Sequence, residues 1–336
     1  MNPVARGLRR AAATAEVAVE RVFFRGDPAR LVIEPYLGYA TPDHLVARGR
    51  VLAMRDVERD AETGGSPLAN ARQMFRLFAT HEVSGVTVSA GDMSAVTDAE
   101  GYFTILLPRG DEAGWHEVAV TADGAAAVCP VLVARTDAQL MVISDIDDTM
   151  MRTGAHNTLS NLWTSFTGSV ESREIFSDAG EMMRMLHRDG RNPVYYVSSS
   201  PWNFHGFLEA VFKRAGLPRG PMFLKDYGFS EEQFITSSHG SHKSSAIDLL
   251  LETNPELPVV LIGDTGQHDA AIYADAVVRH PGRVLHVVLR SAADGVDAQD
   301  RLEIERLRAA NVGVTVGKTY QEAIAVLATR VQPAGG

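Results

Sequence analysis

Residues 141–150 read MVISDIDDTM, a run of apolar residues that ends in a cluster of acids. An unbroken aliphatic run is typical of a strand that is buried on both faces, as in a parallel sheet. Asp145, Asp147 and Asp148 then stand together at the end of that strand. Because buried carboxylates are costly without a cation or hydrogen-bond donors, the cluster predicts a functional site.

The rest of the C-terminal half alternates between strands and helices. Apolar segments such as VYYVSSS, VVLIGD and RVLHVVLR are separated by helical patterns such as FHGFLEAVFKRAG and DRLEIERLRAAN. This alternation predicts an α/β domain over residues 139–332, with a parallel sheet covered by helices on both faces. Ligands bind at the carboxyl ends of the strands in such sheets, where the polar tails of three segments fall.

The N-terminal half has a different pattern. Short strand candidates separated by turn residues, among them RLVIEPYLGYA, LVARGRVLAM and YFTILLP, run through residues 28–138. Their spacing predicts a β-sandwich-like domain, and we find no catalytic set of residues in it. Residues 1–27 show the periodicity of an amphipathic helix. We favour packing of this helix on the protein over membrane binding, because its alanine-rich face is a weak anchor.

Composition places the chain among ordinary globular proteins. Of its 336 residues 45% are hydrophobic and 22% charged, and the formal net charge is −10. A nucleic-acid partner is not expected, because such binders show a basic face. The one cysteine, Cys129, lies in an apolar context, which predicts a buried thiol, no thiolate zinc site and a reducing compartment. We find no secretory signal and no apolar run long enough to span a membrane.

Four polar segments follow one another in the C-terminal half. They are SDIDDT at 144–149, VSSS at 197–200, HK at 242–243 and IGDTGQHD at 262–269. Close aspartates, serines, a lysine and further acids form a set that handles a phosphoryl group together with a divalent cation. Mg²⁺ is the expected cation, because its ligands are oxygens and no pair of histidines has metal-binding spacing.

These segments resemble the four ordered motifs of the haloacid dehalogenase superfamily. SDIDDT, YYVSSSPWNF, FLKDYG and GSHKSSAI narrow the resemblance to the phosphatidate phosphatase catalytic domain family of the lipin-related fungal actin-patch enzyme, in its bacterial form. The resemblance covers roughly residues 139–330. It implies a Rossmann-like parallel sheet of the haloacid dehalogenase type, and the short insertions between the motifs predict little or no cap. It also implies Mg²⁺-dependent hydrolysis of phosphatidate to diacylglycerol and phosphate through an aspartyl-phosphate.

The resemblance assigns a role to individual residues. Asp145 would be the nucleophile, and Asp147 would protonate the leaving oxygen and then activate water. Lys243 would stabilise the nucleophile and the phosphate. The phosphate-binding residues would be Thr149, Ser198, Ser199 and His242. The metal-binding residues would be Asp145, Asp147 through its main-chain carbonyl, Asp264 and Asp269.

Several points stay open at this level. Asp148 has no assigned role, since the commonest phosphatase motif carries glycine there. The substrate is expected to be a phosphorylated lipid at a membrane surface, with the protein cytoplasmic or peripheral to the membrane. Another phosphorylated lipid, protein or metabolite is an alternative substrate, and a non-catalytic phosphatidate-binding protein is an alternative function. The oligomeric state is left open.

Three smaller predictions concern the surroundings of the site. The segment 150–169, with Trp163 and Phe166, is a candidate flap against an acyl chain or the bilayer, although packing is favoured. Trp202, beside the serine motif, is predicted to pack. His205 is predicted to lie in a loop or cap.

Overall fold

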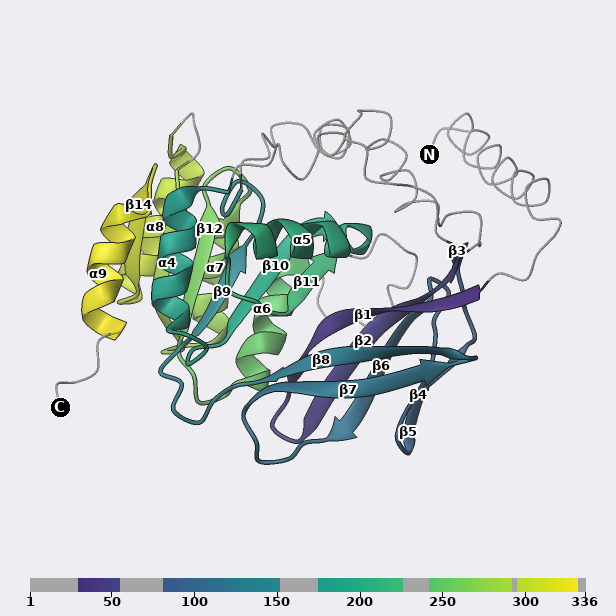
Figure 1. The fold of residues 1–336 in the computed structure, drawn as a ribbon. Helices are drawn as coiled ribbons and strands as arrows, with labels where there is room; N and C mark the ends of the chain where they lie inside the picture. Colours follow the sequence, from purple (N-terminus) through teal and green to yellow (C-terminus); the bar gives the residue numbers. More distant parts are fainter. Residues whose placement is uncertain (1–29, 55–80, 152–174, 226–241, 292–294, 332–336) are drawn as a thin grey trace, which may run out of the picture.

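The computed structural model describes residues 30–54, 81–151, 175–225, 242–291 and 295–331 (Figure 1). These residues form two sheets, and helices accompany the second one. The predicted mixture of a β-rich half and an α/β half is therefore confirmed. The predicted helix at 1–27 and the flap candidate lie outside the described residues, as do the parts of the chain in which a cap would be inserted.

Eight strands of the N-terminal half are joined by hydrogen bonds into one sheet. Its order is β3-β2-β1-β8-β7-β4-β5, and β6 also pairs with β2. The strands are β1 Arg30–Ala40, β2 His44–Met54, β3 His81–Glu82, β4 Thr87–Ala90, β5 Met93–Val96, β6 Tyr102–Pro108, β7 Gly114–Ala122 and β8 Ala125–Val133. Residues such as Val51, Ile105 and Val120 form an apolar core within it. Among the described residues the pairing joins all eight strands in one sheet, and the division into the two sheets of a sandwich stays a prediction. Cys129 is a free, buried thiol in this core, as predicted.

Six parallel strands form the second sheet, in the order β11-β10-β9-β12-β13-β14. The strands are β9 Met141–Asp145, β10 Val194–Pro201, β11 Met222–Lys225, β12 Val259–Asp264, β13 Val284–Arg290 and β14 Gly313–Gly317. Counted from β9, this is the order 3-2-1-4-5-6 of a doubly wound α/β sheet. The chain moves outward from β9 to β11 and then returns to β12 on the other side of β9. The switch point, where such sheets bind ligands, therefore lies between β9 and β12.

Helices cover both faces of the parallel sheet (Figure 1). They are α4 Ser177–His187, α5 His205–Ala215, α6 His242–Thr253, α7 Asp269–Arg279, α8 Ala298–Ala309 and α9 Gln321–Val331, and a 3-10 turn, η3, spans Trp202–Phe204. α4, α5 and α9 share one apolar core with Val142, whereas α6, α7 and α8 share another with Ile143. Successive residues of β9 thus enter opposite cores, which explains why its sequence is apolar without alternation. No helix among the described residues is both long and apolar enough to cross a membrane.

The β-rich sheet contacts the parallel sheet beside β10. Trp202 packs on Tyr36 with ring centroids 4.6 Å apart, so its predicted packing role is confirmed. The prediction for His205 was wrong, because this residue begins α5 and is 2% exposed. Its ring lies 4.5 Å from that of Tyr36, and a contact with a residue so distant in sequence was not visible in the local pattern.

Candidate active site

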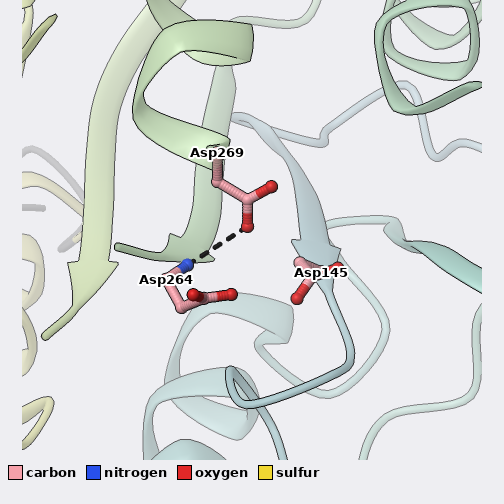
Figure 2. Close-up of side chains that lie close together, drawn as sticks. All are labelled: Asp145, Asp264 and Asp269. Atoms are coloured by element: carbon pink, nitrogen blue, oxygen red, sulfur yellow. Dashed lines mark hydrogen bonds between the residues drawn. The ribbon is translucent and has the colours of Figure 1, made fainter. Parts of the chain in front are cut away.

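Three aspartates meet at the switch point of the parallel sheet. Asp145 ends β9, Asp264 ends the neighbouring strand β12, and Asp269 begins α7. Figure 2 shows their side chains directed toward one another. One carboxylate oxygen from each lies within 4.8 Å of the others, and all three residues are buried. The sheet topology thus assembles the acids that the sequence places far apart.

Lys243 supplies a cation to this cluster from the beginning of α6. Its Nζ lies 2.7 Å from Oδ1 of Asp145 and 2.7 Å from Oδ1 of Asp269. The lysine is itself buried. One ammonium cannot balance three carboxylates, so the site keeps a negative charge if all three are ionised.

The hydrogen bonds and ion pairs of the cluster leave two carboxylate oxygens available for a metal ion. Asp269 uses Oδ1 for Lys243, and its Oδ2 accepts the main-chain N–H of Asp264 at 3.2 Å (Figure 2). Oδ2 of Asp145 and Oδ2 of Asp264 are buried without a hydrogen-bond partner among the described residues. Buried carboxylate oxygens of this kind fit a hard divalent cation, since such an ion would supply the missing partner.

The pKa values of these groups reflect the same crowding. Burial raises the pKa of Asp145 well above its ordinary value, although Lys243 acts in the opposite direction. Burial, together with the charge of Asp269, raises the pKa of Asp264 to about 7. Burial acts to lower the pKa of Lys243, but Asp145 and Asp269 outweigh it, and that pKa lies above its ordinary value. Without a metal ion the cluster therefore has a strong tendency to hold protons at the two strand-end acids.

Asp147 occupies a different environment from Asp145. Its Oδ2 accepts hydrogen bonds from the hydroxyl of Ser198 at 2.7 Å and from the hydroxyl of Ser200 at 2.9 Å. Its Oδ1 has no hydrogen-bond partner among the described residues. One oxygen of this carboxylate is thus fixed and the other remains available for a proton.

Ser200 was missed by the sequence analysis. The run of three serines at the end of β10 was the available signal, but which of them reach Asp147 depends on the path of the strand. β10 and β11 change register between Val197 and Pro201, so the three serines stand opposite only Leu224. This bulge brings the first and third serine to Asp147 and leaves Ser199 exposed. Bulges beside active sites often redirect side chains in this way.

Asp148 has a conformational role. Its φ is 54°, which is the left-handed region that glycine, asparagine and aspartate tolerate best. The chain turns there, immediately after Asp147. The glycine of the commonest phosphatase motif would suit the same backbone, so Asp148 fits this position without a catalytic function. Its charge also contributes to the raised pKa of Asp264, after burial and Asp269.

The other predicted phosphate-binding residues have varied surroundings. The hydroxyl of Thr149 is buried without a partner among the described residues, and its carbonyl accepts the Tyr320 O–H at 2.9 Å. His242 directs Nε2 to the Phe223 carbonyl at 3.2 Å. The roles given to Thr149, Ser198, Ser199 and His242 in phosphate binding stay predictions.

Two further residues support the site and were not predicted. A Cβ on Gly263 would lie 2.5 Å from Oδ2 of Asp269 and 2.7 Å from the Tyr273 hydroxyl, so only glycine fits there. Gln267 donates from Nε2 to the Asp147 carbonyl at 3.1 Å. Both residues belong to the IGDTGQHD segment, but the sequence does not show how closely its loop approaches its neighbours.

Comparison with known proteins identifies the domain that contains these residues. Residues 140–291 match the family model described as "Phosphatidate phosphatase APP1, catalytic domain". The matched segment includes every residue of the acid cluster, Lys243 and the serine bulge.

Two fungal proteins share this segment. Over 156 residues the chain is 28% identical to phosphatidate phosphatase APP1 of Saccharomyces cerevisiae, covering 46% of this chain and 26% of that protein. Over 161 residues it is 27% identical to an uncharacterized protein of Schizosaccharomyces pombe, covering 45% of this chain and 25% of that protein. The matched part of the chain thus spans about a quarter of the length of these relatives.

A solved structure gives a weaker match. A carbohydrate acetylesterase from Xanthomonas citri aligns with 86% of this chain and 69% of its own, at a TM-score of 0.32 and 10% identity. A score this low does not establish a common fold.

Proposed function

We propose, from the match of residues 140–291 to the phosphatidate phosphatase catalytic domain family, that the chain is a Mg²⁺-dependent phosphatase. Its substrate would be phosphatidate, with diacylglycerol and phosphate as products. The lipid would be reached at a membrane surface. The observation that carries this proposal is the difference in surroundings between Asp145 and Asp147.

The two aspartates can divide the chemistry between them because their partners differ. Asp145 lies against Lys243, whose positive charge favours an ionised, nucleophilic carboxylate once the other charges are balanced. Asp147 accepts two serine hydroxyls on one oxygen and keeps the other unpartnered. Two carboxyl groups in contrasting environments are the usual arrangement for a nucleophile and a separate acid or base.

In the first step a carboxylate oxygen of Asp145 attacks phosphorus and forms an aspartyl-phosphate. The bond between phosphorus and the glycerol oxygen breaks, and Asp147, protonated on Oδ1, gives its proton to that oxygen. In the second step Asp147 takes a proton from water, and the water oxygen attacks phosphorus. The bond to Asp145 breaks, phosphate leaves, and both carboxyl groups return to their starting states.

Asp145 and Asp264 are the residues that would hold Mg²⁺, each through its unpartnered Oδ2. Asp269 holds Lys243 and the end of β12, which makes it a supporting acid or a ligand through water. The main-chain carbonyl of Asp147 accepts Gln267 and has a second lone pair for the ion. A bound Mg²⁺ would neutralise charge on the phosphate oxygens during transfer.

We also infer that the parallel sheet is of the haloacid dehalogenase type. The support is the order of the motifs along the chain together with their places: Asp145, the serine bulge and Asp264 at the carboxyl ends of β9, β10 and β12, and Lys243 at the start of α6. A small or absent cap would leave such a site open to a headgroup in a bilayer.

The test is a phosphate-release assay with and without Mg²⁺. Phosphatidate in mixed micelles is compared with soluble phosphate monoesters, using the wild type and Asp145→Asn. We expect Mg²⁺-dependent release from phosphatidate by the wild type alone. Release only from the soluble esters would assign another substrate class. Binding of phosphatidate without any release, by a folded wild type, would refute the enzyme and leave the non-catalytic binding protein.

A further inference from the structure

We propose that the N-terminal β-sheet positions Asp147 for catalysis, because Tyr36 and Arg48 fix Trp202 and thereby the serine bulge. The catalytic consequence rests on the proposed function, whereas the structural coupling does not. Tyr36, Arg48 and Trp202 are positioning residues in this scheme, since they act through Ser198 and Ser200.

Trp202 contacts both an aromatic ring and a guanidinium of the β-rich sheet. Its ring and that of Tyr36, on β1, have centroids 4.6 Å apart and planes inclined by 21°. Cζ of Arg48, on β2, lies 5.1 Å from the centroid of the Trp202 ring. Stacking and cation–π contacts of this kind restrict both the position and the orientation of an indole. Trp202 stands two positions after Ser200 in the sequence.

Arg48 also binds β11, the strand that pairs with β10 before and after the bulge. Its Nη2 donates to the carbonyl of Met222, the first residue of β11, at 2.7 Å. Its Cζ lies 4.5 Å from the centroid of the Phe223 ring, and its Nε donates to the Leu37 carbonyl at 3.0 Å. Among the described residues no carboxylate forms an ion pair with Arg48. Its guanidinium therefore holds main chain and aromatic rings and does not neutralise an acid.

The bulge lies between Tyr196, which pairs with Met222, and Trp202; Arg48 contacts both Met222 and Trp202. Val197 pairs with Phe223 before it and Pro201 pairs with Lys225 after it, while Ser198, Ser199 and Ser200 stand opposite the single residue Leu224. Extra residues in a strand lose their ladder hydrogen bonds, so their conformation depends on what holds the flanks. Here the N–H of Ser200 donates to the Ser198 hydroxyl at 2.9 Å, and the flanks are held by Arg48 and Tyr36.

The bulge in turn orients Asp147. Both serine hydroxyls donate to Oδ2 of Asp147, at 2.7 and 2.9 Å, and this leaves Oδ1 as the oxygen for proton transfer. A shift of Trp202 would move Ser200 first and then turn the carboxyl group of Asp147. Misplacement of a reacting group by about 1 Å can cost roughly 100-fold in rate.

Arg48→Met is the principal test, with Arg50→Met as its matched control. Arg50 lies two residues along the same strand, and its side chain is buried, whereas Arg48 is half-buried. The guanidinium of Arg50 contacts Glu82, the Glu100 carbonyl and the Tyr102 ring, and its charge also acts on Tyr36 and Glu34. Both variants lose a guanidinium from the same strand, but the contacts with Trp202 and with Met222 of β11 belong to Arg48.

Two measurements are made on the full chain. In hydrogen–deuterium exchange, we expect residues 198–204 to exchange about tenfold faster in Arg48→Met and to match the wild type in Arg50→Met. In steady-state assays, we expect Arg48→Met and Ser200→Ala to lower kcat by about 10- to 100-fold while KM stays within about twofold. Trp202→Ala should lower kcat in the same way. Trp202→Phe keeps a stacked ring and should have a kcat close to that of the wild type.

The outcomes separate this proposal from the proposed function. Equal exchange of residues 198–204 in both arginine variants, when both are folded, would overturn the coupling even if the protein is an active phosphatase. If kcat fell to the same extent in Arg48→Met and Arg50→Met, the coupling would also be overturned, because a general loss of stability would explain both decreases. If the wild type releases no phosphate, the proposed function fails, and the exchange comparison still decides the coupling.

Discussion

Lys243 Nζ lies 2.7 Å from Asp145 Oδ1, so a cation at the start of one helix neutralises the acid at the end of the central strand. The same ammonium group reaches Asp269, and the contact therefore joins α6, β9 and α7. Buried ion pairs of this kind contribute little net stability but cost much when one partner is removed.

Lys243→Met should consequently destabilise the protein by roughly 3–5 kcal/mol, because it leaves buried carboxylates without their cation. Urea unfolding at neutral pH measures the loss. Adding Asp269→Asn to Lys243→Met should restore part of it, since one of the unpaired charges is removed. If the double variant were less stable than Lys243→Met, the mutual repulsion inferred for these acids would be wrong.

Neutralising Asp145 and neutralising Asp147 should lower phosphate release to different extents. Asp145→Asn removes the nucleophile and should abolish turnover. Asp147→Asn should lower kcat by roughly 10²- to 10⁴-fold, which is the usual contribution of a general acid or base. Phosphate release in the presence of Mg²⁺ is the measurement, and Asp137→Asn, at an exposed aspartate, is the control. Substantial turnover by Asp145→Asn would remove that residue from the nucleophile role.

Gly263→Ala should disturb the acid cluster without altering any charged group. The new Cβ would collide with Oδ2 of Asp269, so we expect a loss of about 1–3 kcal/mol of stability and weaker Mg²⁺ binding. Gly110→Ala is the matched control, since a Cβ there meets nothing within 4 Å. Thermal unfolding of both variants, with and without Mg²⁺, tests the prediction. Equal behaviour of the two variants would contradict the close packing at Gly263.

Mg²⁺ binding should weaken as the pH falls below about 7. The pKa of Asp264 is raised to about 7, chiefly by burial, and a ligating carboxylate must lose its proton. In the absence of Mg²⁺ the folded state holds a proton that the unfolded chain releases near its ordinary pKa of 3.8. That contribution to stability is full below about pH 3.8 and is lost as the pH rises to about 7.

Calorimetric titration with Mg²⁺ at pH 6, 7 and 8 tests this pH dependence. We expect proton uptake by the buffer, and an affinity that rises between pH 6 and pH 8. Asp264→Asn should weaken Mg²⁺ binding and reduce the number of protons released, leaving the contribution of Asp145. An affinity independent of pH over this range would show that Asp264 is already ionised.

Replacing Asp148 by glycine should reduce stability less than replacing it by alanine. Because its φ is 54°, Asp148→Gly relieves the backbone, whereas Asp148→Ala should be less stable than Asp148→Gly by about 1–2 kcal/mol. Chemical unfolding of the two variants gives the difference directly. If Asp148→Gly lost activity while keeping its stability, Asp148 would have a chemical role that its conformation does not explain.

The sequence by itself determined the parts that depend on local pattern. Unbroken aliphatic runs alternating with helical periodicity predicted the parallel sheet, and the polar ends of its strands predicted the site. Asp145 and Asp264 could be chosen in advance because the carboxyl ends of parallel strands converge at one edge of a sheet. Lys243 was chosen at the predicted start of a helix.

Only the tertiary structure decided what each polar group touches. The selection of Ser200 over Ser199 depends on a bulge in β10, and the requirement for Gly263 depends on the approach of Asp269 from another element. The same is true of the contact between Arg48 and Trp202, which joins residues of different sheets. Periodicity in a sequence records which face of an element is buried, whereas distances between elements arise from packing of the whole chain.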